Sequence, residues 1–136
     1  MSEDYLKVNI TTPHKRWVLE DVVSCTLPGT KGGFQVLFNH APLLSQLEIG
    51  EIKFESTRGT QRFSTSGGFA EVLKNNVSLL LESCERAEEI DVERARLALE
   101  RARKRLKEKS VELDESRAEA ALARALNRIK IAGKVS

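Results

Sequence analysis

The hydrophobic pattern of this 136-residue chain changes its period once, near residue 87. Before that point, apolar residues alternate with polar ones over short runs, which places them on one face of a β-strand. After it, apolar residues recur every three or four positions, which places them on one face of a helix. The change predicts an α+β chain in two parts, residues 1–86 and residues 87–136.

The first part contains short strand-like runs that are separated by turn signals. The candidate strands span residues 5–11, 17–19, 21–27, 34–38, 51–55, 60–65, 68–73 and 77–81. The turn signals are Pro28-Gly29, Arg58-Gly59, Gly67-Gly68 and Asn75-Asn76. Short strands with turns about every ten residues are typical of an antiparallel sandwich or barrel. Because this part shows no helical period of the kind that connects parallel strands, we predict an antiparallel β-sandwich.

The second part contains two helical runs with alanine-rich apolar faces. These faces comprise Ala95, Leu99, Ala102 and Leu106 in the first run, and Ala118, Leu122, Ala125 and Ile129 in the second. With Asp91 and Asp114 as N-caps and a turn at 108–113, the two helices are expected to form an antiparallel hairpin. Burial of apolar surface stabilises a structure by about 25 cal/mol per Å², and alanine buries little area. The hairpin is therefore expected to be weakly held and to depend on docking against another surface.

The composition argues against a membrane-spanning or exported chain. The 22 Lys and Arg residues nearly balance 20 Asp and Glu residues, so no strong overall field points to an anionic partner. No run approaches the ~20 apolar residues that cross a bilayer. The start, Met1-Ser2-Glu3-Asp4, is acidic where a signal peptide is basic. We expect the chain to stay in the compartment where it is made and to meet a membrane only through a partner.

Neither metal binding nor catalysis is predicted. Cys25 and Cys84 lie far apart in strand-like runs without a second ligand at short spacing, so we expect reduced, buried thiols and no zinc site. The chain has no serine in a nucleophile-elbow context and no carboxylate pair in a plausible cleft. We therefore predict a non-catalytic protein that requires no cofactor.

Basic residues concentrate in the second part. Residues 87–136 hold 13 basic and 10 acidic residues, whereas residues 1–86 hold 9 and 10. The run 101–105 is open to two interpretations, a solvated face with ion pairs along the helix or a contact with an acidic partner. A nucleic-acid partner is disfavoured, because the net charge is near zero and no aromatic residues lie among the arginines.

Three stretches carry a family resemblance. Residues 27–44 read LPGTKGGFQVLFNHAPLL, residues 66–72 read SGGFAEV, and residues 90–95 read IDVERA. They are similar, in that order, to the glycine-rich turn with its His-Ala-Pro-Leu loop, to the Gly-Gly-Phe strand and to the first helix start of the epsilon subunit of F-type ATP synthases, called delta in mitochondria. Each motif alone is weak, but their order and spacing along the chain make the resemblance specific.

The resemblance implies a rotor subunit of a bacterial-type complex. The sandwich is implied to sit at the foot of the central stalk, against the gamma subunit and the c-subunit ring, where it couples proton-driven rotation to ATP synthesis. The loop His40-Ala41-Pro42-Leu43 is implied to face the c-ring and gamma. Gly33 stands where many members carry an acid, which leaves this docking to backbone and apolar groups. The complex is implied to lie peripherally at the cytoplasmic face of the bacterial plasma membrane.

The hairpin is implied to be the regulator. Extended along gamma it would restrain ATP hydrolysis, and folded down it would permit turnover. Its second helix is implied to contact acidic loops of the catalytic beta subunits through Arg117, Arg124, Arg128 and Lys130.

Some bacterial members bind ATP on this hairpin as a regulatory ligand. The matching positions here are Glu85, Ile90, Asp91, Arg94, Ala95, Arg101, Arg124 and Arg128. Arginines can fork onto phosphate oxygens, and without a glycine-rich phosphate loop this would be sensing rather than hydrolysis. In the competing interpretation, Asp91 merely caps a helix and Arg94 pairs with it and with Glu85 or Glu88. The alternative function is a stand-alone nucleotide-sensing module.

Overall fold

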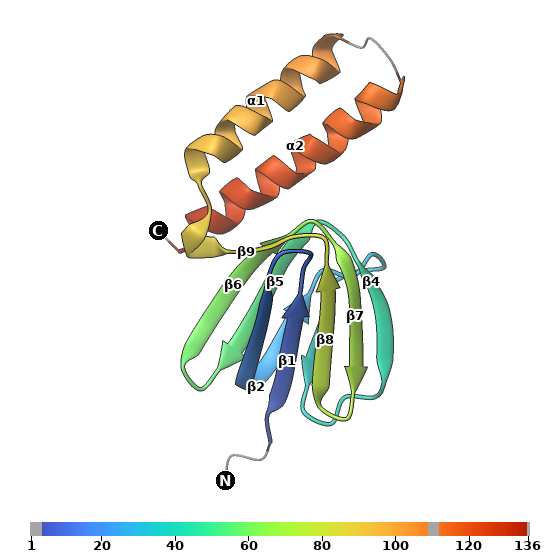
Figure 1. Ribbon diagram of the computed structural model, residues 1–136, viewed down its shortest axis with the longest axis vertical. Helices are drawn as coiled ribbons and strands as arrows, with labels where there is room; N and C mark the ends of the chain where they lie inside the picture. Colours follow the sequence, from blue (N-terminus) through green and yellow to red (C-terminus); the bar gives the residue numbers. More distant parts are fainter. Residues whose placement is uncertain (1–3, 109–111, 136) are drawn as a thin grey trace. The chain divides into compact units, whose positions relative to one another are not determined.

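The computed structural model describes residues 4–108 and 112–135 and divides into two compact units, residues 1–86 and 87–136 (Figure 1). The first unit is a nine-stranded sheet, and the second is built from a short 3-10 helix and two α-helices. The predicted α+β class is thereby confirmed. No helix among the described residues has the length and apolarity needed to cross a membrane.

The sheet unit wraps around a single core. Its strands are β1 Leu6–Thr11, β2 Arg16–Leu27, β3 Phe34–Leu37, β4 Leu43–Leu47, β5 Gly50–Ser56, β6 Gly59–Thr65, β7 Gly68–Leu73, β8 Asn76–Leu81 and β9 Cys84–Arg86. They follow the order β4-β7-β8-β1-β2-β5-β6-β9, with β3 on β2. The end strand β4 meets the segment after β2, where Glu48 N–H donates to Pro28 O at 2.9 Å. The sheet therefore curls back on itself, which forms the predicted sandwich.

Alternation along the strands supplies the core. In β1, Leu6, Val8 and Ile10 are buried while the residues between them are more exposed. At the centre, the rings of Phe54 and Phe63 meet edge to face with centroids 5.6 Å apart. Aromatic pairs in this geometry add about 0.5–1.5 kcal/mol beyond the area that they bury.

The sheet differs from the prediction in one pairing and in two strands. β1 runs parallel to β8, with Val8 opposite Val77, although every other strand pair is antiparallel. The connection between them consists of the intervening strands rather than a helix, so helical periodicity does not reveal it. β4 and β9 were not among the candidate strands, although Cys84 of β9 was placed in a strand-like run. Both strands are short and depend on β7 and β6 for pairing.

β2 is one long strand where the pattern predicted two. Asp21 interrupts it with φ of 57°, and the pairing registers with β1 and β5 both shift beside it. This is a β-bulge, which bends a strand and raises its twist. The bulge allows one strand to pair with β1 over its first half and with β3 and β5 over its second.

The helical unit is an antiparallel hairpin, in which α1 and α2 lie side by side (Figure 1). Its elements are η1 Ala87–Glu89, α1 Val92–Glu108 and α2 Glu112–Gly133. Ala95, Leu99 and Ala102 of α1 are buried as predicted. Ala118 and Ala125 of α2 are also buried, whereas Leu106, Leu122 and Ile129 are only half-buried.

The two predicted N-caps have different outcomes. Asp91 caps α1, because its Oδ1 accepts a hydrogen bond from the Arg94 N–H at 3.1 Å. The prediction for Asp114 is wrong, because α2 begins at Glu112 and Asp114 falls inside its first turn. Most of the predicted turn, residues 109–111, lies outside the described residues.

Candidate functional site

The loop between β3 and β4 holds three of the four residues predicted to dock partners. His40 N–H donates to Leu37 O at 3.1 Å, and His40 Nδ1 lies 2.7 Å from Ala41 O. Ala41 and Pro42 are exposed, and His40 is half-buried. Leu43 instead opens β4 and packs against the core, so its side chain serves the fold.

The next residue, Leu44, belongs to an exposed apolar surface that the sequence reasoning missed. Leu44 is 73% exposed, Phe69 52% and Leu80 58%. Phe69 and Leu80 are direct cross-strand partners on β7 and β8. Leu44 lies on the adjacent strand β4 opposite Glu71, and is therefore a diagonal neighbour of Phe69. Single exposed apolar residues are normal, but neighbouring ones mark a contact surface. We call Leu44, Phe69 and Leu80 the apolar face. No local signal marks its first member, because Leu43-Leu44-Ser45-Gln46-Leu47 does not alternate between apolar and polar residues.

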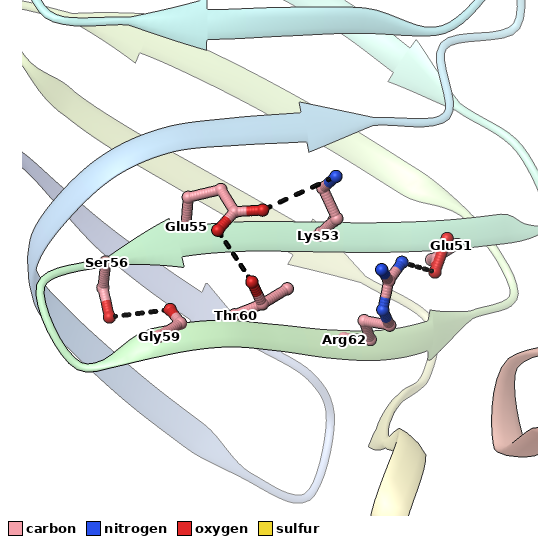
Figure 2. Close-up of polar contacts among 7 residues, drawn as sticks. All are labelled: Glu51, Lys53, Glu55, Ser56, Gly59, Thr60 and Arg62. Atoms are coloured by element: carbon pink, nitrogen blue, oxygen red, sulfur yellow. Dashed lines mark hydrogen bonds and ion pairs between the residues drawn. The ribbon is translucent and has the colours of Figure 1, made fainter. Parts of the chain in front are cut away.

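The outer surface of the β5–β6 hairpin has the opposite character (Figure 2). Arg62 Nη1 pairs with Glu51 Oε2 at 2.9 Å, and Lys53 Nζ lies 3.6 Å from Glu55 Oε1. Thr60 Oγ1 donates to the other oxygen of Glu55 at 2.7 Å, and this bond is the main reason that the pKa of Glu55 is lowered. Charges that pair with one another within this hairpin suit contact with water, so the apolar face is the better docking surface.

The Gly-Gly-Phe motif has a physical explanation in the sheet. Gly68 opens β7 opposite Leu81 and has φ of 152°. A Cβ atom at this position would lie 2.0 Å from the carbonyl oxygen of Leu80. Only glycine allows the β7 and β8 backbones to approach in this way, and the approach places Phe69 beside Leu80. The motif therefore builds the apolar face.

The residues predicted to bind ATP separate into packing residues and exposed ones. Ala95 is fully buried in the seam between the helices, and Ile90 packs with Ile131 and Ala132 of α2. One carboxylate oxygen of Asp91 caps the helix, and its backbone carbonyl oxygen accepts a hydrogen bond from the Ala95 N–H at 3.0 Å. Glu85 lies in β9, in the sheet unit, opposite Ser64. Arg94, Arg101 and Arg124 are exposed.

Four of the hairpin's arginines share one geometric relation. Each immediately precedes a buried seam alanine, in the pairs Arg94-Ala95, Arg101-Ala102, Arg117-Ala118 and Arg124-Ala125. Successive helix residues are turned by about 100°, so all four project from the flank beside the seam. Because antiparallel helices face each other across the seam, these two flanks lie on the same side of the hairpin.

We define Arg94, Arg101, Arg117 and Arg124 as the arginine flank. The other two residues predicted to contact the beta subunits, Arg128 and Lys130, lie differently relative to it. Arg128 follows Arg124 by one helical turn and extends the flank, although it is half-buried and has a polar partner of its own. Lys130 follows Arg124 by six residues and is turned away by about 120°. The four residues predicted to contact the beta subunits therefore do not share one surface.

The competing interpretation of Asp91 and Arg94 is only half confirmed. Asp91 does cap the helix, but it receives the backbone N–H of Arg94 and not the guanidinium group. An ion pair does form nearby, between Arg96 and Glu93 at 2.9 Å, on another part of the helix surface. The Arg94 side chain is thus exposed on the arginine flank, where an anion can reach it.

Both cysteines are free, Cys25 being buried and Cys84 half-buried. Burial raises the pKa of the Cys84 thiol to about 12, and it raises the pKa of Cys25 as well. Since the thiolate is the reactive form, we expect Ellman's reagent at about pH 8 to label neither thiol until denaturant is added. Cys25→Ser and Cys84→Ser variants would assign each signal. Rapid labelling of the native chain would contradict this expectation.

The same pKa shifts predict a loss of stability in alkali. Folded thiols hold their protons more tightly than unfolded ones, whose ordinary pKa is 9.0. Their contribution to stability is therefore fully present below pH 9.0 and is lost as the pH rises towards the folded value of about 12 for Cys84. Urea midpoints measured from pH 8 upwards, with the two serine variants as controls, test this dependence.

Comparisons with known proteins cover both units. Residues 5–87 match the β-sandwich domain of the ATP synthase delta/epsilon chain, and residues 88–133 match its long α-helix domain. The ATP synthase epsilon chain of Pelotomaculum thermopropionicum is 48% identical over 134 residues, 98% of this chain and 100% of that protein. The epsilon chain of Carboxydothermus hydrogenoformans is 49% identical over 132 residues, 97% of this chain and 98% of that protein.

Solved structures agree with these matches. A chain of the Euglena gracilis mitochondrial ATP synthase, solved with OSCP, F1 and the c-ring, superposes with a TM-score of 0.82 at 25% identity, over 93% of this chain and 81% of that one. A chain of the Tetrahymena thermophila mitochondrial ATP synthase central stalk and c-ring superposes with a TM-score of 0.64 over 97% of this chain and 99% of that one. At 14% identity, this likeness shows the fold alone. Both halves match in order and over nearly the full length, so the chain belongs to the family of ATP synthase epsilon chains.

Proposed function

We propose that this chain works in the central stalk of a bacterial F-type ATP synthase as a non-catalytic subunit at the cytoplasmic face of the membrane. The observation that carries the proposal is the contrast between the two outer surfaces of the sandwich. The apolar face offers Leu44, Phe69 and Leu80 to a partner, whereas the β5–β6 hairpin satisfies its own charges. A stalk subunit needs a stiff body with a surface that binds its partner. The two-layer sandwich provides the body, and the apolar face provides the surface.

The partners that we propose for the sandwich are the gamma subunit and the c-ring. The apolar face suits gamma, because a stable subunit contact buries apolar surface at its centre. The exposed residues Ala41 and Pro42, with His40, would face the c-ring. The Euglena relative is part of a structure that contains F1 and the c-ring, and this supports the assignment.

We propose that the hairpin regulates ATP hydrolysis. Its seam is lined largely by alanines, so two packings of the hairpin can differ by only a few kcal/mol, as a switch requires. In the extended form, Arg117 and Arg124 of the arginine flank, with Arg128, would approach acidic loops of the beta subunits. Lys130, on a different side of α2, would contribute less.

Deleting residues 88–136 in the assembled complex tests this regulatory role. The sandwich retains its own core, so we expect assembly and the coupling of rotation to synthesis to persist. ATP hydrolysis by the complex should rise, because the restraining element is gone. A hydrolysis rate equal to that of the intact complex would end the proposal of inhibition. Recovery of the chain alone from native extracts would favour the stand-alone nucleotide-sensing module instead.

We further propose that the arginine flank binds ATP as a regulatory ligand. Exposed arginines from both helices lie on one side of the hairpin, and guanidinium groups can form paired hydrogen bonds with phosphate oxygens. The second carboxylate oxygen of Asp91, which the cap does not use, would accept a hydrogen bond from the adenine amino group. Ile90 and Ala95 would act through packing and backbone, because their side chains are buried.

Titration of ATP into the intact chain tests the site. Arg94→Ala and Arg124→Ala should each weaken binding by about tenfold or more, since each removes a charged hydrogen bond to phosphate. The matched control is Arg103→Ala, an exposed arginine on α1 that is turned by about 200° from Arg101. Equal losses in all three variants would indicate a general charge effect and would contradict this site.

A further inference from the structure

Asn75 joins two loops that are far apart in the sequence. It lies in the turn between β7 and β8, and its side-chain Oδ1 accepts a hydrogen bond from the backbone N–H of Asn39 at 2.7 Å. Its Nδ2 lies 3.5 Å from Asn39 Oδ1, and its own carbonyl oxygen accepts from the Lys7 N–H at 3.0 Å. One residue therefore connects the β7–β8 turn, the start of β1 and the segment that leads into the docking loop.

The backbone conformation of this turn does not explain the side chain. Lys74 and Asn75 have φ of 49° and 65°, which are the positive values that the tightest hairpin turns require at both central positions. Glycine adopts this conformation most readily, and asparagine tolerates it. The turn itself could therefore be made by glycine, and what the asparagine side chain adds is the bond to Asn39.

The backbone N–H of Asn39 has its hydrogen-bond partner outside its own loop. Asn39 also has positive φ, 64°, and it stands where the chain leaves β3 and enters residues 40–42. His40 N–H is held by Leu37 O, and the next backbone N–H towards β3, that of Asn39, is held by Asn75. The direction in which the loop leaves β3 is therefore set by a side chain from a different hairpin.

We infer that Asn75 is a positioning residue that holds the loop 39–42 in the form that docks the stalk partners. This inference rests on the proposed function of that loop. The bond orients the loop relative to the β7–β8 hairpin, which also carries Phe69 and Leu80. Asn75 thereby fixes the two parts of the docking surface, the loop and the apolar face, with respect to each other.

Two substitutions of Asn75 separate the side chain from the backbone. Asn75→Gly keeps the positive φ and removes the acceptor, whereas Asn75→Asp keeps an oxygen that can receive the Asn39 N–H. The matched control is Asn76→Ala at the first residue of β8, whose side chain donates to Lys74 O and takes no part in the bond to Asn39. We expect amide exchange at Asn39 and His40 to accelerate about tenfold in Asn75→Gly only, with the β7 and β8 amides unchanged.

The second measurement is affinity for ATP synthase complexes from which this chain has been removed. Asn75→Gly should bind about fivefold to tenfold more weakly, and Asn75→Asp and Asn76→Ala should bind like the unsubstituted chain. Weakened binding by Asn75→Asp equal to that of Asn75→Gly, or unchanged exchange in Asn75→Gly, would overturn the inference. If the unsubstituted chain itself failed to bind, the proposed function would fall, and the exchange measurement would still decide whether Asn75 holds the loop.

Discussion

Replacing Gly68 by alanine is expected to lower the free energy of unfolding of the sheet unit by about 3 kcal/mol or more. The new Cβ atom would lie 2.0 Å from Leu80 O and 2.8 Å from the Cα atom of Leu81. Both are backbone atoms of the adjacent strand β8, so no side-chain rotation can relieve the contact. β7 must separate from β8, and the hydrogen bonds between them must lengthen.

The chain offers a control that isolates the steric contact. Gly59 has φ of 120°, and a Cβ atom there would meet nothing within 4 Å. Gly59→Ala is therefore strained only by its backbone conformation and should cost about 1–2 kcal/mol. Trp17, the only tryptophan, lies 6.0 Å from Phe63 in the sheet unit, so its fluorescence during urea unfolding reports this unit. Equal destabilisation by the two substitutions would contradict the close approach at Gly68.

Replacing Phe69 by glutamate is expected to weaken docking to the stalk by about a hundredfold while leaving the fold intact. The ring is 52% exposed, so the substitution removes little core packing. In the docked state, however, a carboxylate would be buried against apolar groups without a partner, which costs about 3 kcal/mol. That penalty corresponds to the expected loss of affinity.

Binding to complexes depleted of this chain measures the effect. Leu97→Glu makes a similar change at a residue of α1 that is 61% exposed, and we expect it to leave docking of the sandwich unchanged. Phe69→Ala and Leu80→Ala, singly and together, would show whether this cross-strand pair contacts the partner as a unit. Unaltered binding by Phe69→Glu, with a native urea midpoint, would remove the apolar face from the proposed docking surface.

Much of the hairpin was predictable because its signals are local. The spacing of Ala95, Leu99 and Ala102 depends only on the helical repeat, and the cap at Asp91 depends on three neighbouring residues. Asp114 failed as a cap because glutamate and leucine can also enter a first helical turn, so the helix began earlier. The alternation in β1 was equally readable, since it needs no knowledge of the partner strand.

The candidate sites were only partly predictable. Family motifs pointed to His40, Pro42, Arg94 and Arg124, all of which lie on loops or helix surfaces where a partner can reach them. Motifs could not reveal that Leu43 points to the core while Leu44 points outwards, because β4 exists only through its pairing with β7. Nor could motifs show that the Ile90 side chain is buried against Ile131.

By itself, the sequence determined the two-part division, the kinds of element in each part and the family to which the chain belongs. These follow from periodicity, turn residues and motifs, each of which is written within a short stretch. Only the tertiary structure decided that β1 lies parallel to β8, that Phe69 meets Leu80 on an exposed face, and that Asn75 holds Asn39. These features join residues far apart in the chain, and such pairings are selected by the packing of the whole sheet, which no local pattern records.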